Sequence, residues 1–328
     1  MDNPPDGGYK HLMSAREQPH DGPLRDRIQA AGARSPVRTD TVSHLIDSHV
    51  HVWDPARLEY PWLANVPALG GPHGLADLDT DARGLAGLVV VEAGCSPQQA
   101  LAEVAWVESL AASWPVIRGM VAHAPLELGP EAFIGFAPHL AEGKGIVVGV
   151  RRNVQDEPAG FLTASAFVAG VGGLAEFDLP FDACVREHQL RELIELVDRT
   201  PAVVVLDHLG KPDIRTHGRS AQPQRSHAWF ADVTDLARRP NVVAKLSGLT
   251  TEADRDGWRD SDLRPYLLHA IEVFGPDRCL FGSDWPVATL ATTYERWRDF
   301  VEGTIADLSS AARAAILSGT AERVYRLT

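Results

Sequence analysis

Short apolar runs alternate with segments of helical hydrophobic spacing from His44 to the end of the chain. One such segment carries Leu190, Leu193, Ile194 and Val197 on a single helix face. The apolar runs are continuous and do not alternate with polar residues, which is typical of parallel strands covered on both faces. Strands are predicted over residues 45–53, 88–92, 116–123, 146–151, 179–185, 203–208, 242–246 and 279–284.

Repeated strand–helix units of this kind predict an α/β fold, a (β/α)8 TIM barrel, over residues 44–328. An open doubly wound sheet is the alternative, and it is disfavoured because no glycine-rich nucleotide-binding loop follows any predicted strand. Further helices are predicted from Ser96 through Leu110, near 131–142 and over 321–327. The loop over residues 60–74 is long enough to be a lid or a pocket wall.

Residues 1–43 lack this periodicity. Proline and glycine interrupt them, as at Pro4-Pro5, Gly7-Gly8 and Pro36, and charges are scattered between. Such a composition predicts a disordered, flexible N-terminal extension, to which we assign no function.

Charge and composition narrow the classes of partner. The formal net charge of -13 argues against nucleic acid, whose phosphates attract a basic surface. No apolar run is long enough to cross a membrane, and the N-terminus lacks the apolar core of a signal peptide. Three widely spaced cysteines, Cys95, Cys184 and Cys279, predict reduced thiols in a cytoplasmic protein. We therefore expect a small-molecule substrate; the oligomeric state stays open, with a homodimer as one option.

Polar side chains end most of the predicted strands. Because residues two apart on a strand point the same way, His49 and His51 project from one face, where two imidazoles form half of a metal site or polarise a carbonyl group. In a parallel barrel all strand ends meet on one rim, where barrel enzymes carry out their chemistry. The residues gathered there would be His49, His51, Glu92, His123, Arg151 or Arg152, His188, His208 and Asp284.

Five motifs, in order along the chain, resemble the lactonase branch of the amidohydrolase superfamily. They are IDSHVHVWD from Ile46, GVRRNVQDEP from Gly149, LDHLGKP from Leu206, KLSG from Lys245 and FGSDWP from Phe281. That branch includes fuconolactonases, rhamnonolactonases, 4-sulfomuconolactonases and 2-pyrone-4,6-dicarboxylate lactonases. The resemblance covers essentially the whole chain after the extension. It implies the barrel that the periodicity predicts and the hydrolysis of a lactone, for which we expect a sugar-acid lactone.

By this resemblance, His49, His51, His208 and Asp284 form the catalytic set. Asp284 is expected to be the general base that takes a proton from the attacking water; capping of the next helix is the alternative. The histidines are expected either to hold one divalent ion, Zn²⁺ being the best suited, or to polarise the carbonyl directly without a metal. His49, His51 and Asp284 are the candidate metal ligands, and purely structural hydrogen bonding is the alternative for the histidines.

The remaining candidates are expected to bind substrate. No lysine ends the fourth strand, which argues against a carbamylated, binuclear centre; Arg151 and Arg152 stand there and point opposite ways. The resemblance favours Arg151 as the ligand of substrate hydroxyls or a carboxylate, with Arg152 paired outside the barrel. Glu92 stays open between metal ligand, base, partner of a nearby arginine and structural residue. Candidates for lining the pocket, with packing or surface positions as the alternative, are His123, His188, Lys211, Trp53 and Trp285.

Two other functions stay open. A metal-dependent decarboxylase of the same superfamily would need its metal absolutely and would turn over no lactone. A barrel that binds a ligand without turnover is the third hypothesis, and the His and Asp residues at so many strand ends argue against it. Loops over residues 60–74, 155–161 and 214–225 are expected to set specificity, so the sequence does not identify the substrate.

Overall fold

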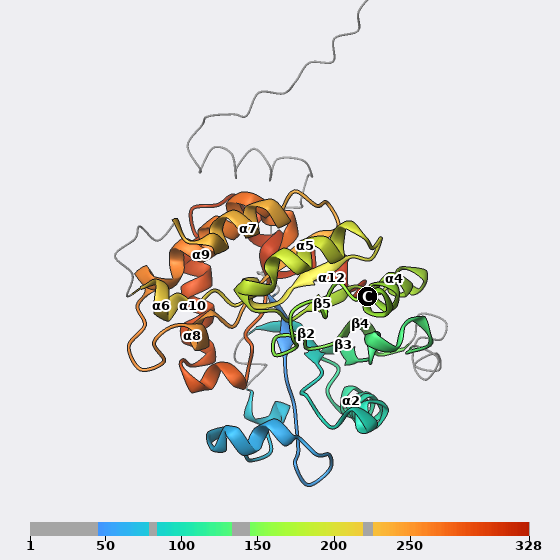
Figure 1. Cartoon of the computed structure of the whole chain (residues 1–328). Coiled ribbons are helices and arrows are strands. Elements are labelled where there is room, and N and C mark those ends of the chain that lie inside the picture. Colours follow the sequence, from blue (N-terminus) through green and yellow to red (C-terminus); the bar gives the residue numbers. More distant parts are fainter. Residues whose placement is uncertain (1–44, 79–83, 133–144, 219–225, 328) are drawn as a thin grey trace, which may run out of the picture.

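The structure is a computed structural model that describes residues 45–78, 84–132, 145–218 and 226–327. Within them, eight parallel strands form one sheet in the order of the sequence, and the predicted (β/α)8 barrel is confirmed (Figure 1). The predicted extension over 1–43 and nearly all of the helix predicted near 131–142 lie outside the described residues. The strands are β1 (Leu45–Val50), β2 (Leu85–Val91), β3 (Ile117–His123), β4 (Val147–Arg151), β5 (Phe181–Ala183), β6 (Val204–Leu206), β7 (Val242–Leu246) and β8 (Cys279–Phe281).

Five of the predicted strands end earlier than the apolar pattern suggested. β1 stops at Val50, β2 at Val91, β5 at Ala183, β6 at Leu206 and β8 at Phe281. After the last two, the backbone turns into the left-handed region, with φ of 52° at His208 and 61° at Asp284. A left-handed residue cannot continue a strand, so the polar ends of these runs form turns on the barrel rim.

The barrel closes between its first and last strands. The His51 amide donates to the Trp285 carbonyl at 2.7 Å, and the Asp284 amide donates to the His49 carbonyl at 2.9 Å. These two bonds continue the parallel pairing beyond the ends of β1 and β8. The seam thus sets residues from the two ends of the sequence side by side.

Helices surround the barrel and bury their apolar faces against it (Figure 1). The helix predicted from Ser96 begins with a 3-10 turn, η4 (Pro97–Gln99), and continues as α2; the helix carrying Leu190 and Val197 is α5. The last predicted helix is shorter than expected and ends at Val324. The helices are α2 (Ala100–Ser113), α4 (Ser165–Gly173), α5 (Leu190–Asp198), α6 (Ile214–His217), α7 (Ala228–Leu236), α8 (Leu249–Glu252), α9 (Asp260–Phe274), α10 (Tyr294–Ile305), α11 (Ser310–Ala314) and α12 (Thr320–Val324).

A second apolar cluster fills the barrel from inside. It joins strand residues such as Val91, Val205 and Leu280 to Tyr325, which follows α12. The Tyr325 hydroxyl donates to Asp182 Oδ2 at 2.7 Å, so this cluster contacts a buried polar layer above it. Packed side chains therefore close the floor of the rim site.

The long loop after β1 folds over the rim in short 3-10 turns, η1 (Pro61–Asn65), η2 (Pro67–Leu69) and η3 (Leu75–Asp77). Its apolar side chains form a cluster around Trp53. The loop is thus packed onto the barrel instead of standing free.

Two sequence expectations concern the chain as a whole. All three cysteines are free and buried, as expected of reduced thiols. Among the described helices, none combines the length and apolarity that a membrane crossing requires.

Candidate active site

The site begins with two histidines, His49 in β1 and His51 directly after it. His49 and His51 are both buried, and their Nε2 atoms lie 3.1 Å apart. The side-chain alternation of a strand turns both rings to the barrel interior, as the sequence predicted.

Asp284 and His208 complete a cluster with these two rings. Asp284 Oδ1 lies 3.8 Å from His49 Nε2, 3.6 Å from His51 Nε2 and 3.9 Å from His208 Nε2. The structure therefore brings together all four residues of the predicted catalytic set. The positive φ of His208 and Asp284 is costly for residues with a Cβ, and such strain recurs at functional sites.

The other nitrogen of each ring is held by a neighbouring element. His51 Nδ1 bonds the Val91 carbonyl at 2.9 Å, and His208 Nδ1 bonds the Ser247 hydroxyl at 2.9 Å. His49 Nδ1 lies 3.1 Å from Lys245 Nζ and 3.3 Å from Asp207 Oδ1. Bonds of this kind orient an imidazole and leave its Nε2 directed at the site.

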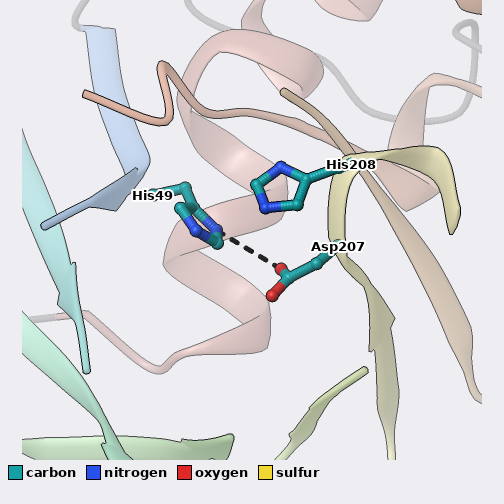
Figure 2. A group of neighbouring side chains, drawn as sticks. All are labelled: His49, Asp207 and His208. Carbon is teal, nitrogen blue, oxygen red and sulfur yellow. Dashed lines mark ion pairs between the residues drawn. The ribbon is translucent and has the colours of Figure 1, made fainter. Parts of the chain in front are cut away.

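Beneath His49 lies a layer of fully buried charges that the sequence reasoning did not single out. Lys245 Nζ lies 2.6 Å from Asp182 Oδ2 and 2.9 Å from Asp207 Oδ1, and all three residues are inaccessible to solvent. Figure 2 shows the side chains of His49, Asp207 and His208 grouped together, with the ion pair between His49 and Asp207 drawn. Their signal in the sequence is a charged residue inside an otherwise apolar strand run, which is costly unless it has a partner.

Arg151 faces the barrel interior, as expected, and Glu92 is its partner. Arg151 Nε donates to Glu92 Oε1 at 2.5 Å, and Nη2 donates to the Glu92 carbonyl at 2.6 Å. Glu92 Oε2 accepts from the Gly94 amide at 2.7 Å. Both oxygens of Glu92 are thus occupied, which favours the ion-pair option among those left open. Arg151 Nη1 lies 3.5 Å from His49 Nε2, so the guanidinium borders the site.

Arg152 points the other way and pairs outside the barrel. Its guanidinium lies 3.1 Å from Glu127 Oε2 and 2.5 Å from Glu157 Oε1, both partly exposed. The opposite orientation of neighbouring strand residues explains the difference from Arg151.

The predicted pocket-lining residues lie in different surroundings. Lys211 Nζ donates to Gln155 Oε1 at 2.5 Å, and His123 ends β3 half-buried. His188 is exposed on the 3-10 turn η9 (Glu187–Gln189). The two tryptophans hold the loop over the rim. The Trp53 indole donates to the Leu69 and Gly71 carbonyls at 3.2 and 2.9 Å, and Trp53 and Trp285 both contact the His73 ring edge-on.

Burial and neighbouring charges set the protonation of the cluster. Burial alone would raise the pKa of Asp284, but the neighbouring His208 ring, the hydrogen bond from His51 and the His49 ring hold that pKa well below its usual range. Burial lowers the pKa of His208 to about 4. Burial and Lys245 hold the pKa of His49 well below its usual range. At neutral pH the site therefore combines an ionised Asp284 carboxylate with uncharged imidazoles at His49 and His208.

The cluster has the spacing of a metal site. His49, His51 and Asp284 offer ligand atoms within 4.8 Å of one another, as do His49, Asp207 and His208. Ligands about 2.1 Å from a tetrahedral zinc lie roughly 3.4 Å apart, and the distances of 3.1, 3.6 and 3.8 Å among the first three are close to that value. Nitrogen and carboxylate donors suit Zn²⁺, so the residues fit one divalent ion.

Comparison with known proteins agrees with this geometry. A family model described as amidohydrolase matches residues 46–327. An L-fucono-1,5-lactonase of Burkholderia multivorans is 37% identical over 295 residues, which are 86% of this chain and 96% of that protein. The crystal structure of an amidohydrolase from Burkholderia multivorans with bound HEPES has a TM-score of 0.77 at 34% identity and covers 87% of this chain and 100% of its own. A second crystal structure of an amidohydrolase from that organism, with bound zinc, has a TM-score of 0.74 at 35% identity and the same coverage.

Proposed function

The chain belongs to the amidohydrolase family, and from that premise we propose that it is a hydrolase that opens the lactone of a sugar acid. The similarity to an L-fucono-1,5-lactonase over most of both chains supports this substrate class. We also propose that it works in the cytoplasm, because Cys95, Cys184 and Cys279 are free thiols.

One observation carries the proposal. Three imidazole Nε2 atoms, from His49, His51 and His208, lie within 3.9 Å of one carboxylate oxygen of Asp284 on the barrel rim. Lactone hydrolysis needs a base for water and an electrophile for the carbonyl oxygen, and this group contains both.

In the proposed mechanism, Asp284 accepts a proton from the water whose oxygen attacks the lactone carbonyl carbon. The carbonyl oxygen becomes negative, and the N–H groups that face it from the imidazoles stabilise that charge. The ring C–O bond then breaks, and the leaving alkoxide takes the proton from Asp284, giving a hydroxy acid. The low pKa of Asp284 keeps it ionised at neutral pH and ready to accept the proton.

A bound zinc ion would be held by His49, His51 and Asp284, with His208 beside them, and would polarise the carbonyl oxygen as a Lewis acid. We propose Zn²⁺ because nitrogen and carboxylate ligands at this spacing suit it.

Arg151 is proposed to bind substrate hydroxyls or the carboxylate of the product. Glu92 fixes its Nε and Nη2, which leaves Nη1 toward His49 and the site. Lys211 and His123 are proposed to line the pocket near the rim, with His188 at its mouth. Trp53 and Trp285 are proposed to form the pocket wall that contacts the sugar ring, together with the loop that they hold in place.

The test is a panel of aldono-1,4- and 1,5-lactones and unsaturated dicarboxylate lactones, assayed by release of acid, on protein as purified and after chelation, with metal content measured on the same samples. We expect turnover of a sugar lactone and a loss of about 10²–10⁴-fold in Asp284→Asn. Asp178→Asn is the matched control, because Asp178 has φ of 53° like Asp284 but lies exposed beside Arg326. Absence of turnover with every lactone, in protein that carries stoichiometric zinc, would favour the decarboxylase instead.

A further inference from the structure

Lys245 lies inside the barrel and takes no part in the steps described above. Its side chain is fully buried on β7, between Asp182, Asp207 and the ring of His49. The ammonium lies 2.6 Å from Asp182 Oδ2, 2.9 Å from Asp207 Oδ1 and 3.1 Å from His49 Nδ1. Two carboxylates at these distances keep the lysine charged.

The contact with His49 fixes where the proton of that ring must be. A lysine ammonium carries three donors and no acceptor. An Nδ1–H on His49 would point a donor at the lysine donor across 3.1 Å, whereas Asp207 Oδ1, which could accept it, lies farther away at 3.3 Å. The shorter contact therefore assigns the lone pair to Nδ1. An imidazole with an unprotonated Nδ1 carries its single proton on Nε2, which faces the site.

The neighbouring ring agrees with this assignment independently. His51 Nδ1 lies 2.9 Å from the Val91 carbonyl, which can only accept, so Nδ1 carries a proton, and in a neutral His51 ring Nε2 then has the lone pair. His49 Nε2 lies 3.1 Å from that lone pair and donates to it. Along the path from Lys245 through His49 and His51 to Val91, each donor then meets an acceptor. The longer contact between Arg151 Nη1 and His49 Nε2, at 3.5 Å, is the one that this assignment leaves without a hydrogen bond.

We propose that Lys245 is a positioning residue that holds His49 as a hydrogen-bond donor toward the reacting carbonyl and that competes with a metal ion for this ring. The catalytic half of this statement rests on the proposed lactonase function, since a lactone carbonyl oxygen is the acceptor that His49 Nε2–H would meet. The competition with metal rests only on the positions of the His49 and His51 ring nitrogens.

The competition follows from the second arrangement that the site allows. To ligate a metal through Nε2, His49 must move its proton to Nδ1, where Asp207 Oδ1 at 3.3 Å can accept it. Two Nε2 lone pairs, of His49 and His51, would then face each other across 3.1 Å, which a cation between them stabilises. Lys245 opposes this arrangement twice, because its donor needs the Nδ1 lone pair and its charge repels the ion. Metal binding therefore costs the chain the bond from Lys245 to His49.

The direct test is the ¹⁵N NMR spectrum of histidine-labelled, full-length protein after chelation. His49 is assigned by its absence in His49→Gln. We expect a pyridine-like resonance for His49 Nδ1 and a pyrrole-like resonance for Nε2, and the opposite pattern for His51. A pyrrole-like His49 Nδ1 in the parent protein would overturn the proposal, and this result needs no variant at position 245 to fold.

The second test measures zinc affinity by competition with a chromophoric chelator. Lys245→Met frees Nδ1 to donate to Asp207, so we expect its zinc affinity to rise by at least about tenfold, the lower end of what outer partners of metal ligands contribute. Arg239→Met is the matched control: it removes one positive charge that pairs with Asp198 and Asp235 and leaves His49 alone. Circular dichroism and thermal unfolding establish that both variants fold. A folded Lys245→Met with parental or weaker zinc affinity would contradict the competition.

These readouts separate the inference from the proposed function. A pyridine-like His49 Nδ1 in a protein that opens no lactone would uphold the assignment of the ring and refute the substrate. Turnover of a lactone by a parent protein with a pyrrole-like Nδ1 would do the reverse.

Discussion

Replacement of Gly248 by alanine tests whether the position of His208 decides activity. Gly248 has φ of +64°, and a Cβ built there would lie closest to His208 Nδ1, with His208 Cγ at 2.6 Å and His208 Cβ at 3.1 Å. Ordinary contact begins at 3.4 Å, so the ring must move by at least about 0.8 Å, the shortfall at Cγ (3.4 − 2.6). It cannot do so freely, because Nδ1 is bound to the Ser247 hydroxyl at 2.9 Å.

The expected loss in kcat/KM for Gly248→Ala is about 10²-fold, the cost of a misplacement near 1 Å in an active site. That corresponds to about 2.7 kcal/mol of transition-state stabilisation. Steady-state turnover of the lactone identified by the panel measures it. The left-handed backbone adds a separate penalty of about 1–2 kcal/mol in the free energy of unfolding.

Gly84→Ala controls for that backbone penalty. Gly84 also has φ of +64°, but a Cβ there meets nothing within 4 Å and lies far along the chain from His208. We expect it to lose stability as Gly248→Ala does and to keep the parental kcat/KM. If both variants lose the same stability and both keep full activity, the argument that His208 is held in place by Gly248 is refuted.

Three further predictions concern the surroundings of the site. Arg151→Met leaves Glu92 charged and buried and should lower the free energy of unfolding by about 3–5 kcal/mol, measured by chemical denaturation. Arg152→Met, whose partners are partly exposed, should lower it by only about 0.2–1 kcal/mol. Equal losses in the two variants would contradict the opposite orientations of the two arginines. Burial and neighbouring carboxylate charge raise the pKa of Glu103 to about 8, so the folded chain keeps a proton that the unfolded chain releases. Unfolding free energy should therefore fall, on the order of a few kcal/mol, as pH rises from about 4.5 to 8, and Glu103→Gln should flatten this slope in denaturation at pH 5, 6.5 and 8. Trp53→Phe removes two indole hydrogen bonds and should raise KM and speed proteolysis of the loop over the rim, with kcat changed less; an unchanged KM and cleavage rate would show that the loop does not depend on them.

The sequence predicted the barrel because its signal is local. Continuous apolar runs and helical spacing report burial on both faces, and the order of the strands followed from them. Strand alternation and the parallel barrel placed the polar residues of the strand ends on one rim, and the resemblance to the lactonase branch selected from them the four residues of the cluster. The ends of β6 and β8 could not be placed, since nothing in an apolar run shows where the backbone turns to positive φ.

The buried charges escaped prediction for a different reason. Lys245 and Asp207 stand inside motifs that were noticed, but their roles depend on which side chains face each other across the barrel. Asp182 reaches Lys245 across 63 residues and His49 reaches it across 196. Periodicity along one strand does not contain that information; the register of eight strands does.

The seam between β1 and β8 determines when the site can form during protein synthesis. His49 and His51 leave the ribosome with the first strand, whereas Asp284 emerges only when the last strand is made. The bond from the Asp284 amide to the His49 carbonyl therefore closes the ring of strands and completes the group of reacting residues in one event. A nascent chain that lacks β8 has the three histidines but neither Asp284 nor a closed barrel around them, and closing so long a loop is slow. Activity in this protein thus reports completion of the barrel, and two fragments divided within the chain would regain it only by reassociating across that seam.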